Sequence, residues 1–174
     1  MQFSLLSWLF AVALTIHNLE EALFMPRWQP PDPRLSHKAG AKAFRLAIVV
    51  ITALAYIAVY LAQLGGKESF GAYVVTGFAL GMLVNVLFPH VLISLRFRCY
   101  APGVVSAVLL ILPITALLLY TSFTEGWVLS SKFIWAGPLV VVCMLALLPL
   151  LFFLGRLLFG RESQQSSSEA NANH

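Results

Sequence analysis

Five apolar stretches, each long enough to cross a lipid bilayer, limit what this chain can fold into. We place them at about residues 3–25, 44–64, 71–95, 103–123 and 133–158. A helix needs roughly 20 apolar residues to cross about 30 Å of hydrocarbon. With 60% hydrophobic and 10% charged residues and a mean hydropathy of +0.86, the chain has more apolar side chains than a soluble core can bury. The sequence therefore predicts an all-α, polytopic transmembrane bundle of five spans within residues 1–159.

The basic residues predict the orientation of this bundle. With five spans, the first loop, the third loop and the C-terminus lie on one side, which receives nine of the eleven Lys and Arg residues: Arg27, Arg34, Lys38, Lys42, Arg45, Arg96, Arg98, Arg156 and Arg161. The positive-inside rule then puts the N-terminus outside and the C-terminus in the cytoplasm. The net charge of +4 thus reflects topology, and we expect the lipid bilayer and no nucleic acid as partner. Residues 160–174 are polar and Ser-rich, which predicts a disordered cytoplasmic tail.

A histidine and two adjacent carboxylates interrupt the first span. Each charged group at the bilayer centre costs roughly 2.5–3.5 kcal/mol on insertion scales, so a simple anchor would not carry them. On a helix, His17, Glu20 and Glu21 share one narrow face, because residues three and four apart are neighbours. This spacing can hold one divalent cation, and it also allows a plain His–Glu hydrogen bond.

A second polar group lies on the third span, at a similar expected depth. Pro89 has no N–H, so the carbonyl of Asn85 loses its helical partner, the helix should bend, and His90 joins a small polar cluster. After the third span comes Tyr100-Ala101-Pro102-Gly103, which opens the fourth span. This segment is typical of a capping turn, but it can also place the Tyr100 hydroxyl over the same pocket.

These three elements, in this order, resemble the HXXEE family of small bacterial membrane proteins. That family has a His-x-x-Glu-Glu motif, a further histidine and a Tyr-x-Pro-Gly motif. The resemblance marks seven residues: His17, Glu20, Glu21, His90, Tyr100, Pro102 and Gly103. It implies a multi-pass protein of the bacterial inner membrane and says which residues to test. It supplies no activity, because the family is of unknown function.

The first functional hypothesis is a membrane-embedded metalloenzyme. His17, His90 and one of Glu20 or Glu21 would bind zinc or iron and leave one position open. The other glutamate would act as general base, and Tyr100 would donate a hydrogen bond to the substrate. The residues Asn85, Pro102 and Gly103 would support the site. A pocket just below the cytoplasmic surface suits a lipid-like or other apolar small molecule.

Two alternatives stay open on the sequence alone. Intramembrane Glu and His also carry protons and ions in transporters. The polar residues gather in one leaflet, however, so a continuous path would require a homo-oligomer. The third hypothesis is a structural or accessory membrane protein, in which these side chains only hold helices together. The adjacent pair of glutamates is hard to explain in that way, since one polar group suffices to pair two helices.

Overall fold

The computed structural model describes residues 2–32 and 40–172, with side chains up to Phe159. Within these residues the chain is helical and has no strand, and five helical segments are long and apolar enough to cross a membrane. They are Gln2–Arg27, Ala41–Gly65, Phe70–Phe97, Val104–Thr124 and Ser130–Phe159. The prediction of an all-α bundle of five membrane-spanning segments is therefore confirmed.

Several of these segments consist of more than one helical element. The first is α1 (Gln2–Phe24) followed by the 3₁₀ turn η1 (Met25–Arg27), and the second is α2 (Ala41–Gly65). The third comprises α3 (Phe70–Asn85), the π-helical η3 (Val86–Val91) and α4 (Leu92–Phe97). The fourth comprises α5 (Val104–Ser106), η4 (Ala107–Ile111) and α6 (Leu112–Thr124), and the last is α7 (Ser130–Ala172).

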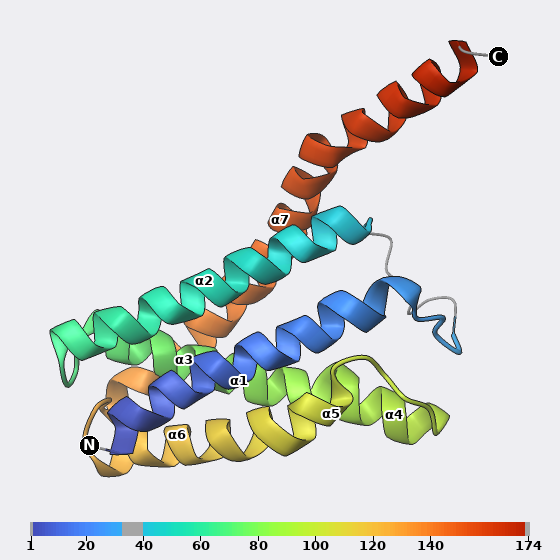
Figure 1. Cartoon of the computed structure of the whole chain (residues 1–174). Coiled ribbons are helices and arrows are strands. Elements are labelled where there is room, and N and C mark those ends of the chain that lie inside the picture. Colours follow the sequence, from blue (N-terminus) through green and yellow to red (C-terminus); the bar gives the residue numbers. More distant parts are fainter. Residues whose placement is uncertain (1, 33–39, 173–174) are drawn as a thin grey trace.

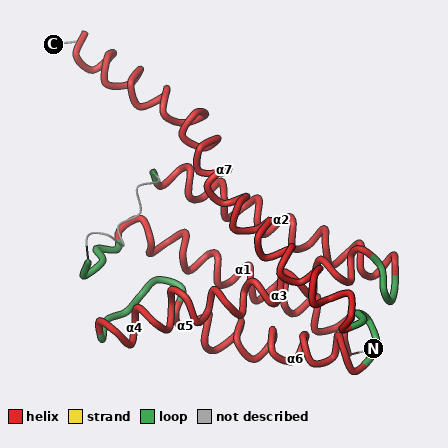
Figure 2. The backbone as a smooth tube through the Cα atoms, turned by 180° about the vertical axis from the view of Figure 1, so that it is seen from behind, coloured by secondary structure: helices red, strands yellow, loops and turns green. Residues whose placement is uncertain are grey.

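Helix α3 lies at the centre of the bundle and packs against α2, α6 and α7, while α1 packs against α2 and α6 (Figures 1 and 2). Small residues bring these helices close together, as in many membrane proteins. A Cβ added to Gly71 would lie 2.3 Å from the backbone nitrogen of Ala62 on α2. A Cβ added to Gly77 would lie 2.7 Å from the Cβ of Val140 on α7. These glycines thus fix how tightly α3 contacts its neighbours.

The third span is broken at Pro89, as predicted. Phe88 has the extended angles φ −125° and ψ 117°, so the helical path stops before Pro89 and resumes after it. The physical cause is the missing N–H of proline together with the steric restriction on the preceding residue. The break lies directly beside His90 and so determines where that side chain is placed.

The C-terminal end of α1, the N-terminal end of α2, the α4–α5 loop and the C-terminal half of α7 lie at the same end of the bundle (Figure 1). We call this the basic end, because its described residues include Arg27, Arg45, Arg96, Arg98 and Arg156. The arrangement agrees with an odd number of spans. That the basic end faces the cytoplasm stays a prediction.

The C-terminal segment differs from the expected disordered tail. Helix α7 continues to Ala172 and projects away from the other helices, and only residues 173–174 of the expected tail lie outside the described residues (Figure 1). The segment 160–172 has no proline and no β-branched residue, and its Gln, Glu, Arg and Ala residues favour helix. The polar composition therefore did not reveal the helical backbone conformation of this segment.

Candidate functional site

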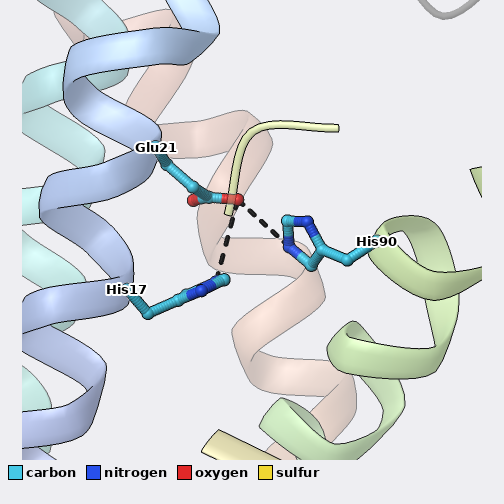
Figure 3. Close-up of side chains that lie close together, drawn as sticks. All are labelled: His17, Glu21 and His90. Atoms are coloured by element: carbon cyan, nitrogen blue, oxygen red, sulfur yellow. Dashed lines mark ion pairs between the residues drawn. The ribbon is translucent and has the colours of Figure 1, made fainter. Parts of the chain in front are cut away.

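The site is built by three side chains from two spans: His17 and Glu21 of α1 and His90 of η3 (Figure 3). The His90 Nε2 atom lies 3.2 Å from Glu21 Oε1, and the His17 Nε2 atom lies 3.8 Å from the same oxygen. One ligand atom from each residue falls within 4.8 Å of the other two. Both histidines are buried, with exposed fractions of 0% and 1%. His90 therefore faces the bundle interior rather than lipid.

The imidazole of His17 is held in place from one side only. Its Nδ1 atom lies 3.1 Å from Ser106 Oγ, while its buried Nε2 atom has no hydrogen-bond partner among the described residues. A hydrogen bond at one ring nitrogen fixes the ring orientation and leaves the other nitrogen for a ligand. His17 Nε2 is thus a buried polar atom that points into the site without a hydrogen-bond partner, with Glu21 Oε1 3.8 Å away.

His90 closes the other side of the site. Its ring lies edge-on to the His17 ring, with centroids 4.9 Å apart. The same Nε2 atom that faces Glu21 also lies 3.3 Å from Asn85 Nδ2. Asn85 ends α3 just before the break, so the polar cluster expected around Pro89 is present.

The ligand atoms have the spacing that a small divalent ion needs. Zinc binds nitrogen and oxygen at roughly 2.0–2.2 Å, so ligand atoms around one ion lie about 3–4 Å apart. The two separations from Glu21 Oε1, 3.2 and 3.8 Å, fall in this range. Two imidazoles and one carboxylate also form a donor set that suits zinc and non-haem iron.

Glu20 has a different position from Glu21 and binds the start of the fourth span. Its Oε1 atom accepts hydrogen bonds from the Tyr100 hydroxyl at 2.7 Å and the Gly103 amide at 3.0 Å. Its Oε2 atom accepts from the Ser106 amide at 2.9 Å and from the Ser106 hydroxyl. A carboxylate at a helix N-terminus satisfies N–H groups that have no partner within the helix. Glu20 therefore ties α1 to α5.

Gly103 brings the Tyr-x-Pro-Gly segment directly against the site. Its φ of +90° is a left-handed conformation that favours glycine. An added Cβ would lie 2.8 Å from His90 Cε1, 2.9 Å from His17 Cε1 and 3.0 Å from Glu21 Cγ. Any larger residue would thus press on all three members of the cluster. This contact explains why the glycine of the Tyr-x-Pro-Gly motif occurs together with the His-x-x-Glu-Glu motif, although the two motifs are far apart in the sequence.

Tyr100 and Pro102 lie at the turn that opens the fourth span, as expected, but Tyr100 does not contact the histidines. The Tyr100 hydroxyl binds Glu20 rather than the group formed by His17, Glu21 and His90, and its side chain is 46% exposed. Pro102 is buried in the turn that precedes Gly103. Sequence reasoning missed Ser106, which joins Glu20 to His17. The available signal was its isolation, because it is the only polar side chain between Gly103 and Thr115.

Comparison with known proteins agrees with this arrangement. Residues 8–118 match the family model described as "Protein of unknown function with HXXEE motif", a stretch that includes every residue of the site. The chain is also 31% identical over 146 residues to the uncharacterized protein YrkK of Bacillus subtilis (strain 168), covering 84% of this chain and 92% of that protein. No solved structure matches the chain. The chain belongs to the HXXEE family.

Proposed function

We propose that this protein is a membrane-embedded metal-dependent enzyme, with a divalent ion, zinc or iron, held by His17, Glu21 and His90. One observation carries the proposal: three ligand atoms from two spans converge, and one of them, His17 Nε2, is buried without a hydrogen-bond partner. A bound cation would coordinate that nitrogen and would neutralise the Glu21 carboxylate at membrane depth.

The structure favours Glu21 over Glu20 as the carboxylate ligand. Both oxygens of Glu20 already accept two hydrogen bonds each, whereas Glu21 Oε1 faces both histidines. Glu20 acts instead as a positioning residue through Ser106, which contacts His17 Nδ1. A carboxylate that orients a metal-binding imidazole, here through a hydroxyl, raises the basicity of that ligand.

Three protein ligands with an open position are typical of catalytic rather than structural metal sites. A metal ion at such a site polarises a substrate oxygen or activates water. The ligands lie on membrane-spanning segments, so a lipid-like or apolar substrate in the bilayer can reach them directly. The bilayer is expected to be the bacterial cell membrane, since a relative comes from Bacillus subtilis.

A transporter needs a continuous polar path across the bundle, and the contacts between α1 and α2 do not form one. Polar pairs join these helices at Gln63–Ser7 (3.0 Å), Tyr56–Thr15 (3.2 Å) and Asn18–Thr52 (2.7 Å). Between Ser7 and Thr15, α1 buries the apolar residues Phe10, Ala11, Ala13 and Leu14. On α1, an apolar layer therefore separates the site from the end opposite the basic end.

Metal analysis of the detergent-purified full chain tests the proposal. We expect about one ion per chain in the wild type and loss of the ion in Glu21→Gln and His90→Ala. Glu68→Gln is the matched control, because Glu68 is exposed and pairs with Lys132 at the other end of the bundle. Wild-type protein that holds no stoichiometric metal after purification in zinc- or iron-supplemented buffer contradicts the proposal.

Catalysis is tested separately from binding. Metal-loaded and metal-stripped protein is incubated in vesicles of total bacterial lipid, and the lipids are compared by mass spectrometry. We expect a product that appears with loaded wild type and with loaded Glu68→Gln, and that is absent with stripped wild type and with Glu21→Gln. A lipid profile that is identical with loaded and stripped wild type argues against an enzyme acting on these lipids.

A further inference from the structure

An apolar chamber of about 300 Å³ lies between α1, α2, α3, η3 and α7, and Glu21 forms part of its wall. The polar lining residues, Asn18, Glu21 and Asn85, all come from α1 and α3. The lining residues from α2 and α7 are apolar and include Ile48, Met144 and Leu148. The helices α1 and α3 thus contribute the polar groups of the chamber, including the candidate metal ligand, whereas α2 and α7 contribute only hydrocarbon and thioether surface.

The size and lining of the chamber define what it can hold. Ligand pockets typically measure roughly 300–1,000 Å³ and have mainly apolar walls with a few polar groups that fix orientation. This chamber lies at the lower end of that range, which suits part of one hydrocarbon chain rather than a whole two-chain lipid. The side chains of Asn18, Glu21 and Asn85 supply the few polar groups.

The chamber has exposed residues in its wall on the side of α3, η3 and α7. Val84, Phe88 and Leu145 line it, and their exposed fractions are 45%, 63% and 63%. All three belong to membrane-spanning segments, so their exposed surface faces lipid. Phe88 is also the residue at which the helical path is interrupted. A hydrocarbon chain can therefore enter sideways from the bilayer, where it is most concentrated.

We infer that this chamber binds a single hydrocarbon chain of a membrane amphiphile, which enters between α3 and α7 and places its polar group at Glu21. The inference rests on the proposed function where a reaction of the bound chain at the metal site is concerned, and it names the substrate class of that site. Chain binding itself depends only on the shape and lining of the chamber. It can therefore be measured with or without metal.

The test is photo-crosslinking with a long-chain fatty alcohol that carries a diazirine in the chain, added to vesicles containing the full-length protein. Labelled residues are located by mass spectrometry. In the wild type we expect labels to concentrate on chamber residues such as Met144 and Leu148. Labelling spread evenly over the lipid-facing residues of all five spans overturns the inference.

Two pairs of variants make the test specific. Ile48→Trp and Leu148→Trp fill the chamber from different helices. A hydrocarbon chain that enters a chamber already filled by an indole overpacks it, so we expect chamber labelling to fall about tenfold or more. Their neighbours Val49→Trp and Leu150→Trp are the matched controls, since Val49 and Leu150 are 65% and 51% exposed. Unchanged chamber labelling in both filling variants overturns the inference.

The same samples separate this inference from the proposed function. In wild type stripped of metal with a chelator we expect chamber labelling to persist, because no residue of the chamber wall is changed. A wild type that is labelled in the chamber but binds no metal would retain the chain-binding site and contradict only the enzyme. A wild type that binds metal but shows no preferential labelling of the chamber would contradict only the chain-binding inference.

Discussion

Glu20 and Glu21 are adjacent in the sequence, yet their carboxylates bind different parts of the molecule. Glu20 accepts hydrogen bonds from Tyr100, Gly103 and Ser106, whereas Glu21 lies 3.2 Å from His90. On a helix, consecutive side chains diverge by about 100°, so the pair can reach two neighbours at once. This division explains why one glutamate would not suffice: one fixes the fourth span against α1, and the other faces the histidines.

The two glutamates should therefore give different phenotypes when each is changed to glutamine. In Glu20→Gln, one oxygen becomes an NH₂ group that meets two donors, so we expect a loss of about 1–3 kcal/mol in the free energy of unfolding. In Glu21→Gln, we expect metal loss with little change in the stability of the metal-free protein. Thermal denaturation of metal-free samples, together with metal analysis, distinguishes the two. Equal destabilisation by both substitutions would contradict the division of roles.

Gly103 offers a direct test of the packing between the Tyr-x-Pro-Gly turn and the cluster. Gly103→Ala introduces a Cβ that presses on His17, His90 and Glu21, so we expect metal binding to be abolished or weakened at least about tenfold. Gly126→Ala is the matched control. Gly126 also has a positive φ, of +68°, but a Cβ there would meet nothing within 4 Å.

An alanine in the left-handed conformation lowers the free energy of unfolding by about 1–3 kcal/mol at most. Both alanine variants incur this loss, so it does not distinguish them. Only Gly103→Ala adds the steric contact with the site. Metal affinity measured by competition with a chelator is the readout. If both variants bind metal as the wild type does, Gly103 does not constrain the cluster.

Ser106 should act on the metal through His17. Ser106→Ala removes the group that contacts His17 Nδ1, while it leaves the backbone amide that binds Glu20. We expect metal affinity to fall about 10–100-fold, which is typical when a partner of a metal-binding histidine is lost. Ser94→Ala, on α4 of the third span, is a control for removing a hydroxyl from a span. Wild-type affinity in Ser106→Ala would show that His17 is oriented by packing alone.

The sequence predicted the larger features because they depend on local chemistry. The number of spans follows from apolar length, and the break beside His90 follows from Pro89. The meeting of His17, Glu21 and His90 also followed from depth and order along the chain. The choice of Glu21 over Glu20 as the residue facing His90 could not be predicted, because it depends on how α1 is rotated against its neighbours. The role of Ser106 and the chamber likewise arise from packing between spans.

The Tyr100 hydroxyl provides a pH-dependent readout of its contact with Glu20. Partial burial and the neighbouring Glu20 carboxylate raise the pKa of Tyr100 to about 12, from an ordinary value of 10.0. A raised pKa of an acid means that the neutral form is favoured in the folded state. The contribution of Tyr100 to stability is therefore complete below about pH 10 and is lost as the pH rises through about 12.

We expect the phenolate absorbance of Tyr100, obtained as the difference between the wild type and Tyr100→Phe, to rise near pH 12. In Glu20→Gln the same difference should rise at lower pH, because the negative charge that opposes ionisation is gone. Tyr120→Phe is the control for an exposed tyrosine, since Tyr120 is 67% exposed. A Tyr100 titration that does not move in Glu20→Gln would mean that burial alone sets its pKa, and that the hydrogen bond between α1 and the turn before α5 is not maintained in solution.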